Sequence, residues 1–168
     1  MILGGQIISV VAMMAIILSF QCKSNKKLAF VYGTGATCFA ISYFMLGQPS
    51  AALYNIISAI FSIMCMKSNL KTKTNFGIIV ALFVIATYFT YENLWSLVLM
   101  SAVIGSAYSM MFKSGKFIRN IRFFYISPVW LINNTLVCFS IGGLICEVIT
   151  MVSVIVSFIR FRKTGFEN

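Results

Sequence analysis

Seven long apolar segments alternate with short polar connectors along the chain. They cover residues 2–21, 28–47, 50–67, 75–91, 94–112, 121–139 and 142–160. Each has about the 17–25 residues that a helix needs to cross the hydrocarbon core of a bilayer. Connectors such as GQPS at 47–50 and SIGG at 140–143 are rich in turn-forming residues. The pattern predicts an all-α polytopic membrane protein, with seven transmembrane helices in a single membrane domain over residues 1–168.

Composition supports this class. Hydrophobic residues make up 60% of the chain, charged residues only 10%, and the mean hydropathy is +0.96, whereas soluble domains carry about 25% charged residues. The chain has no histidine and its five cysteines form no CxxC pair, so we expect no metal, no cofactor and no enzyme activity. The net charge is +10, but the 13 Lys and Arg residues that produce it lie in short clusters between apolar segments. This placement disfavours a nucleic-acid partner.

The basic residues all fall in alternate connectors and in the C-terminal tail. They are Lys23, Lys26 and Lys27; Lys67, Lys71 and Lys73; Lys113, Lys116, Arg119 and Arg122; and Arg160, Arg162 and Lys163. The other helix ends hold no Lys or Arg, only Glu92. Because cytoplasmic loops are enriched in Lys and Arg, we expect the N-terminus outside and the C-terminus in the cytoplasm.

The chain also contains an internal repeat. KSNK at 23–26 follows the first helix and KSGK at 113–116 follows the fifth. At an offset of 92 residues, a stripe of small and polar residues on the third helix aligns with one on the seventh, and Asn55 falls opposite Glu147. We therefore expect a 3+1+3 arrangement of parallel repeats, with a first three-helix repeat at 1–67, a linker helix at 75–91 and a second repeat at 94–160.

Two stretches carry a family resemblance: YGTGATCFAISYFMLGQPSAALYNIISAIFSIM, and NIRFFYISPVW continuing to the terminal IRF. They resemble the YgjV-type bacterial inner-membrane family, which implies a multi-pass protein of the bacterial plasma membrane. The 3+1+3 plan is more distantly similar to the SWEET and PQ-loop (MtN3-like) transporters. In SWEETs, asparagines on the third helix of each triplet line the solute pocket, at the places of Asn55 and Glu147 here. The chain departs from that pattern because it lacks a Pro-Gln dipeptide and retains only Pro128 among the hinge prolines.

Glu147 is the most informative single residue, because a charged side chain at the centre of a membrane helix costs about 2.5–3.5 kcal/mol on insertion scales. It shares a helix face with small and polar residues, so we expect it to point into the bundle. All Lys and Arg are assigned to the cytoplasmic end, so we expect amides such as Asn55, Asn133 or Asn134 as its partners. It could carry a proton or bind a cationic solute, or it could be a buried carboxyl that ties two helices together.

Asn133 and Asn134 lie in the sixth helix beside Trp130. They could bind a polar solute over the indole ring, or they could form hydrogen bonds between helices. We expect a small-solute transporter or facilitator, with Asn55, Glu147, Asn133, Asn134 and Trp130 around a cavity between the repeats. A regulatory or interaction subunit that binds another membrane protein is the alternative, and a dry bundle with Glu147 closed off by a partner would favour it. The expected partners are the lipid bilayer and an unidentified small solute, with homo-oligomers left open.

Overall fold

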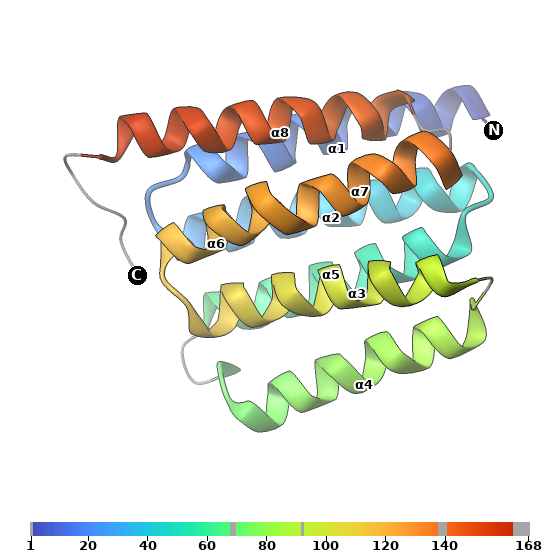
Figure 1. Ribbon diagram of the computed structural model, residues 1–168, viewed down its shortest axis with the longest axis horizontal. Helices are drawn as coiled ribbons and strands as arrows, with labels where there is room; N and C mark the ends of the chain where they lie inside the picture. The colour runs from blue at the N-terminus through green and yellow to red at the C-terminus, as the bar shows by residue number, and fades with distance from the viewer. Residues whose placement is uncertain (1, 68–69, 92, 138–140, 163–168) are drawn as a thin grey trace.

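The computed structural model describes residues 2–67, 70–91, 93–137 and 141–162, which form a bundle of seven helical rods (Figure 1). Five are regular helices: α1 (Ile2–Gln21), α2 (Asn25–Met45), α3 (Pro49–Met66), α4 (Lys73–Phe89) and α5 (Leu94–Phe112). The sixth rod is a continuous helical run over 115–137, and the seventh is α8 (Ile141–Arg160). Glu92 and the connector at 138–140 lie outside the described residues.

Local sequence explains where several helices begin. The side chains of Thr72 and Asn93 accept hydrogen bonds from backbone N–H groups in the first turns of α4 and α5, at 3.1 and 2.9 Å, which is the usual role of an N-cap. Pro49 starts α3, where its missing N–H costs nothing. Gly47 closes the preceding turn with a φ of 74°, a conformation that favours glycine.

The sixth rod begins earlier than predicted, at Gly115 rather than at residue 121. It is made of α6 (Gly115–Ile121), η2 (Arg122–Ile126), α7 (Ser127–Ile132) and η3 (Asn133–Val137). In the π-helical segment η2 the N–H of Ser127 donates to the carbonyl of Arg122, five residues back. Pro128 follows directly and has no N–H, so the wider π turn relieves the clash that its ring would cause in an α-helix.

The rods pack in an order that brings distant parts of the sequence together. Helix α1 contacts both α2 and α8, while α3 contacts α5, and α4 lies at the edge of the bundle against α3 and α5 (Figure 1). Small residues allow the closest approaches. A Cβ at Gly35 of α2 would lie 2.9 Å from Ile16 of α1, and one at Gly142 of α8 would collide with Ser9 of α1, so a larger side chain at either position would force its neighbours to shift.

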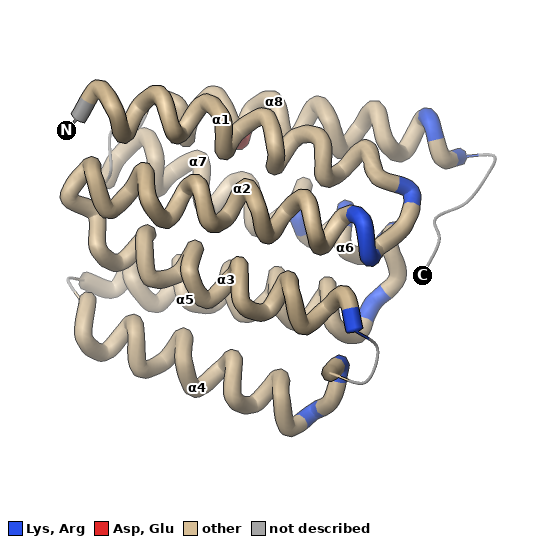
Figure 2. Tube along the Cα trace, turned by 180° about the vertical axis from the view of Figure 1, so that it is seen from behind, with Lys and Arg blue, Asp and Glu red and all other residues tan. Residues whose placement is uncertain are grey.

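Lys and Arg gather at one end of the bundle, and the N-terminal end of α1 lies at the other (Figure 2). In the described part of the chain, five helices are long and apolar enough to cross a membrane, namely α1, α2, α3, α5 and α8, and α4 is an apolar helix of 17 residues. Two arginines depart from the predicted pattern. Arg119 and Arg122 are buried inside the bundle, 0% and 5% exposed, because the sixth rod starts before them and carries them inward.

Candidate functional site

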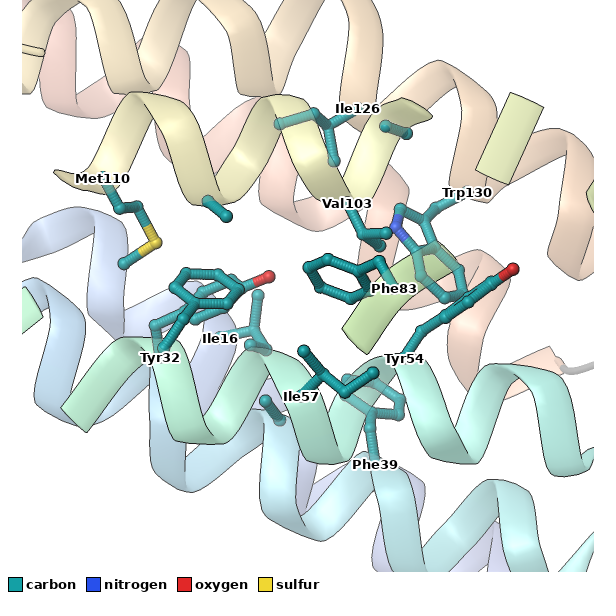
Figure 3. Close-up of a cluster of buried hydrophobic side chains, with 14 of the residues drawn as sticks. Ile16, Tyr32, Phe39, Tyr54, Ile57, Phe83, Val103, Met110, Ile126 and Trp130 are labelled. Atoms are coloured by element: carbon teal, nitrogen blue, oxygen red, sulfur yellow. The ribbon is translucent and has the colours of Figure 1, made fainter. Parts of the chain in front are cut away.

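A small polar cavity lies at the centre of the bundle, between α1–α3 on one side and α5, the sixth rod and α8 on the other. Its volume is about 30 Å³, enough for a small number of water molecules. Figure 3 shows apolar residues of its wall, among them Ile16 and Phe39 from α1 and α2 and Val103 and Ile126 from α5 and the sixth rod. The polar and charged residues in the wall are Tyr32, Tyr43, Asn55, Ser58, Ser106, Arg122, Asn134 and Glu147.

Glu147 points into the bundle but has a different partner from the one predicted. Its two carboxylate oxygens accept hydrogen bonds from Nη2 of Arg122, at 2.7 and 2.8 Å. Both side chains are buried, 6% exposed for Arg122 and 8% for Glu147. The expectation that amides would face Glu147 and that no cation would reach its layer was therefore wrong. Arg122 lies about 10 Å along the sixth rod from Gly115, at about 1.5 Å per residue, and from there its long side chain reaches Glu147.

The guanidinium group of Arg122 is only partly satisfied by this pair. Nη2 makes both bonds to Glu147, while Nε is buried and has no hydrogen-bond partner among the described residues. The guanidinium carbon also lies 5.8 Å from the centre of the Phe20 ring, within reach of a cation–π interaction. An arginine normally binds a carboxylate through two nitrogens, so this geometry leaves one donor of a buried cation without an acceptor in the described part of the bundle.

Asn55 and Glu147, aligned by the 92-residue offset, line the same cavity. The Asn55 amide Nδ2 donates to the carbonyl of Ala51 in its own helix, at 2.8 Å. Glu147 instead bonds to Arg122, and Asn55 keeps its amide oxygen as an acceptor that it can present to the cavity.

Asn134 links the sixth rod to α2. Its Oδ1 accepts a hydrogen bond from the Tyr43 hydroxyl at 2.9 Å, and the Tyr43 ring stacks on Trp130 at 6.2 Å between centroids. Gly143 of α8 makes room for this amide, since a Cβ there would lie 2.6 Å from Asn134. The predicted neighbours Trp130 and Asn134 therefore both reach the cavity wall, and Asn134 also forms the interhelical hydrogen bond that was the alternative interpretation.

Asn133 faces a second, separate pocket. Its Oδ1 accepts a hydrogen bond from Trp95 Nε1 at 3.2 Å. This pocket has a volume of about 20 Å³ and lies toward the end of the bundle away from the lysines. Its polar wall residues are Gln48, Ser50, Tyr54, Asn93, Ser96 and Asn133. The two consecutive asparagines thus face different pockets.

Arg119 organises the neighbouring basic end. Its guanidinium donates to the carbonyls of Phe20 and Cys22 at 3.2 and 2.8 Å, to the carbonyl of Gly115 at 3.0 Å and to the Ser157 hydroxyl at 3.1 Å. Phe20 lies in the last turn of α1 and Cys22 directly follows the helix, where backbone acceptors lack helical donors. Arg119 therefore joins α1, the sixth rod and α8, and it holds in place the rod that carries Arg122.

Arg122 is the main site residue that the sequence analysis missed. A usable signal was present: Arg122, Ile126, Trp130 and Asn134 recur at spacings of four residues, which places neighbouring members on one helix face, and all four line the cavity. Ser114, whose hydroxyl accepts from the N–H of Phe117 at 3.5 Å, marks the true start of the rod. Tyr32 and Tyr43 carried no comparable signal, because aromatic residues are common throughout the chain.

Comparison with known proteins identifies a family. No curated protein and no solved structure matches the chain. The Imp-YgjV family model, described as a bacterial inner membrane protein, matches residues 3–165. Together with the five helices of the described residues that are long and apolar enough to cross a bilayer, this match locates the protein in the bacterial inner membrane. The chain therefore belongs to the Imp-YgjV family of bacterial inner membrane proteins.

Proposed function

We propose that the protein is a transporter or facilitator for a small polar solute, which binds in the central cavity beside Arg122 and Glu147. The observation that carries the proposal is the buried ion pair in the wall of a polar cavity where the two groups of three helices meet. The proposal involves no catalytic step.

Helix packing alone gives little reason for such a pair. Replacing a buried ion pair by apolar residues of similar volume is often neutral or stabilising, because the two charges must lose their water. Charged residues inside membrane bundles commonly mark the path of an ion or substrate. A pair that lines a cavity and leaves a donor unsatisfied fits this role better than a pair enclosed by apolar side chains.

The helix contacts are consistent with a duplicated transporter fold. At the 92-residue offset, α1 corresponds to α5, α2 to the sixth rod and α3 to α8. The contact between α1 and α8 then has its counterpart in the contact between α5 and α3. Under this proposal, α4 is the linker, the two repeats span 1–67 and 94–160, and the cavity lies near their pseudo-twofold axis.

The second pocket suggests a route to the cavity. It opens at the end of the bundle that holds no Lys or Arg among the described residues, and we assign this end to the outside on the positive-inside rule. The consecutive residues Asn133 and Asn134 line the second pocket and the central cavity respectively, and they accept hydrogen bonds from Trp95 and Tyr43. Opening these two contacts would connect the cavity to the outer face.

An osmotic assay tests the proposal even though the solute is unidentified. The full-length protein is reconstituted into proteoliposomes, and light scattering follows their re-swelling in gradients of individual small solutes, including zwitterionic, neutral, anionic and cationic compounds. We expect at least one solute to equilibrate faster than in protein-free vesicles. We also expect that acceleration to be lost when both members of the ion pair are replaced, as Arg122→Gln/Glu147→Gln. Equal rates with and without protein across the panel would refute the transport function.

An interaction or regulatory subunit is the second candidate. The favouring observation is that Arg122 closes off the Glu147 carboxylate and that the cavity has a volume of only about 30 Å³. Under this alternative the pair fixes the bundle for a membrane partner. No solute in the panel would then cross faster in proteoliposomes.

A further inference from the structure

We infer that the central cavity binds a small zwitterion, a solute of about the size of glycine that carries one carboxylate and one ammonium group. This inference rests on the proposed transport function and specifies its substrate class. The solute carboxylate would bind Arg122, and its ammonium group would bind Glu147 and the Asn55 amide oxygen.

The charge balance of the cavity favours a solute without net charge. Arg122 and Glu147 are the two charged residues in its wall within the described part of the chain, and they sum to zero. A purely anionic or cationic solute would leave one uncompensated charge in a buried site, at a cost of several kcal/mol per ion. A zwitterion brings one charge of each sign, so both protein charges and both solute charges find partners.

The unused edge of Arg122 indicates where the solute carboxylate binds. Nη2 serves both oxygens of Glu147, and Nε–H remains buried without an acceptor among the described residues. Leaving a buried donor unsatisfied costs about 1–3 kcal/mol, more for a charged group. A carboxylate beside Nε supplies the missing acceptor and forms a charge-assisted hydrogen bond, which is about twice as strong as a neutral one.

Glu147 and Asn55 offer acceptors for an ammonium group in the same cavity. An ionised carboxylate has about four lone-pair sites, and the Glu147 carboxylate uses only two of them for Arg122. Asn55 donates its Nδ2 to Ala51, which leaves its carbonyl oxygen to accept. Glu147 and Asn55 come from α8 and α3, one from each repeat, so an ammonium group between them is held by both halves of the bundle.

The size of the cavity limits the solute. A volume of about 30 Å³ holds about two water molecules, so even glycine requires the walls to separate slightly. Tyr32, Tyr43 and Trp130 form part of these walls, and their rigid rings leave little space for a side chain. We therefore expect glycine and alanine to bind, and branched or aromatic amino acids to be excluded.

Binding of labelled glycine provides the test. Full-length protein in lipid nanodiscs is titrated with tritiated glycine, and unlabelled competitors then displace it. Glycinamide has an amide in place of the carboxylate, and glycolate has a hydroxyl in place of the ammonium group. We expect saturable glycine binding, displacement by glycine and alanine, and at least tenfold weaker displacement by glycinamide, glycolate and leucine.

Variants link the binding to the site. The double replacement Arg122→Gln/Glu147→Gln keeps the cavity neutral and should fold while losing at least tenfold in glycine affinity. Lys116→Gln removes an exposed cation from the same rod, outside the cavity wall, and should bind glycine as the native chain does. Melting temperatures of all variants in nanodiscs distinguish lost binding from lost folding.

The outcomes separate this inference from the proposed function. If glycolate or glycinamide binds as well as glycine, or if the double variant retains glycine binding, the zwitterion site is wrong. If glycine does not bind but another solute from the osmotic panel crosses the membrane, the zwitterion site is also wrong, while the transport function stands. If no solute of any class binds or crosses, both fail.

Discussion

Breaking the Arg122–Glu147 pair from one side should destabilise the protein far more than replacing both members together. The variants are Arg122→Gln, Glu147→Gln and the double replacement. Glutamine matches glutamate in size, whereas at position 122 it is shorter than arginine and also removes the contact with Phe20; the double-mutant cycle separates this packing cost from the charge effect. Both side chains are at most 8% exposed, and the Nη2–Oε1 distance is 2.7 Å, so a single replacement leaves one buried charge without its counter-ion.

The expected magnitude follows from this geometry. Two unit charges about 4 Å apart interact by about 4 kcal/mol at an effective dielectric constant of about 20. Removal of one partner from buried pairs costs about 3–5 kcal/mol in other proteins, while replacement of both by well-packed uncharged residues is often nearly neutral. We therefore expect each single variant to lose about 3–5 kcal/mol in the free energy of unfolding, and the double variant to lie within about 1 kcal/mol of the native chain.

Reversible unfolding in mixed micelles, as a function of the mole fraction of sodium dodecyl sulfate, measures these differences. The double-mutant cycle then gives the coupling energy between the two side chains directly. Single variants that unfold within about 1 kcal/mol of the native chain would refute a tight, desolvated pair. A double variant as unstable as the sum of the two single variants would show that the side chains act independently.

Three further predictions concern orientation, packing and the basic end. A reporter fused after Asn168 should be active only in the cytoplasm, because the Lys and Arg lie at that end, and periplasmic activity would overturn the topology. Gly143→Ala should destabilise the bundle by about 1–3 kcal/mol through overpacking, because its Cβ would lie 2.6 Å from the side-chain amide of Asn134. Gly77→Ala is the control and should be tolerated, because its Cβ would meet no atom within 4 Å. Chemical unfolding of the two variants tests the contrast. Arg119→Ala should lower the free energy of unfolding by at least about 2 kcal/mol, because several charge-assisted hydrogen bonds are lost. Lys116→Gln is the control and should change the free energy of unfolding by less than about 0.5 kcal/mol. Equal melting curves for these two variants would contradict the structural role of Arg119.

The sequence predicted most of the helices because the bilayer fixes their length. An apolar run of about 20 residues with turn-forming ends has few alternatives to a helix in a membrane. The predicted ranges 2–21 and 94–112 coincide with α1 and α5. The predicted start of the sixth helix, residue 121, lies after the observed start at Gly115, because Lys116, Arg119 and Arg122 resemble the charges of a loop. Their burial depends on acceptors such as the carbonyl of Cys22, and pattern analysis cannot see contacts across the fold.

The same limit applies to the site. The small and polar stripe around Glu147 correctly indicated that this residue faces the interior, because helical spacing is a local property. Its partner could not be found that way. Arg122 lies 25 residues earlier, on another rod, and a pair at that separation depends on how two helices pack. The π turn at Arg122 is also a response to Pro128 and to the surrounding helices, for which the sequence shows only the proline.

The neutrality of the Arg122–Glu147 pair also bears on the response of the bundle to membrane voltage. Moving one elementary charge across a potential of 100 mV changes its energy by about 2.3 kcal/mol. The two side chains carry opposite charges and are joined by hydrogen bonds of 2.7 and 2.8 Å, so moving them together transfers no net charge through the electric field. A displacement of the intact pair therefore contributes no gating charge of its own. The pair itself would carry gating charge in a step that pulls Arg122 and Glu147 apart along the membrane normal, and that step would respond to the potential.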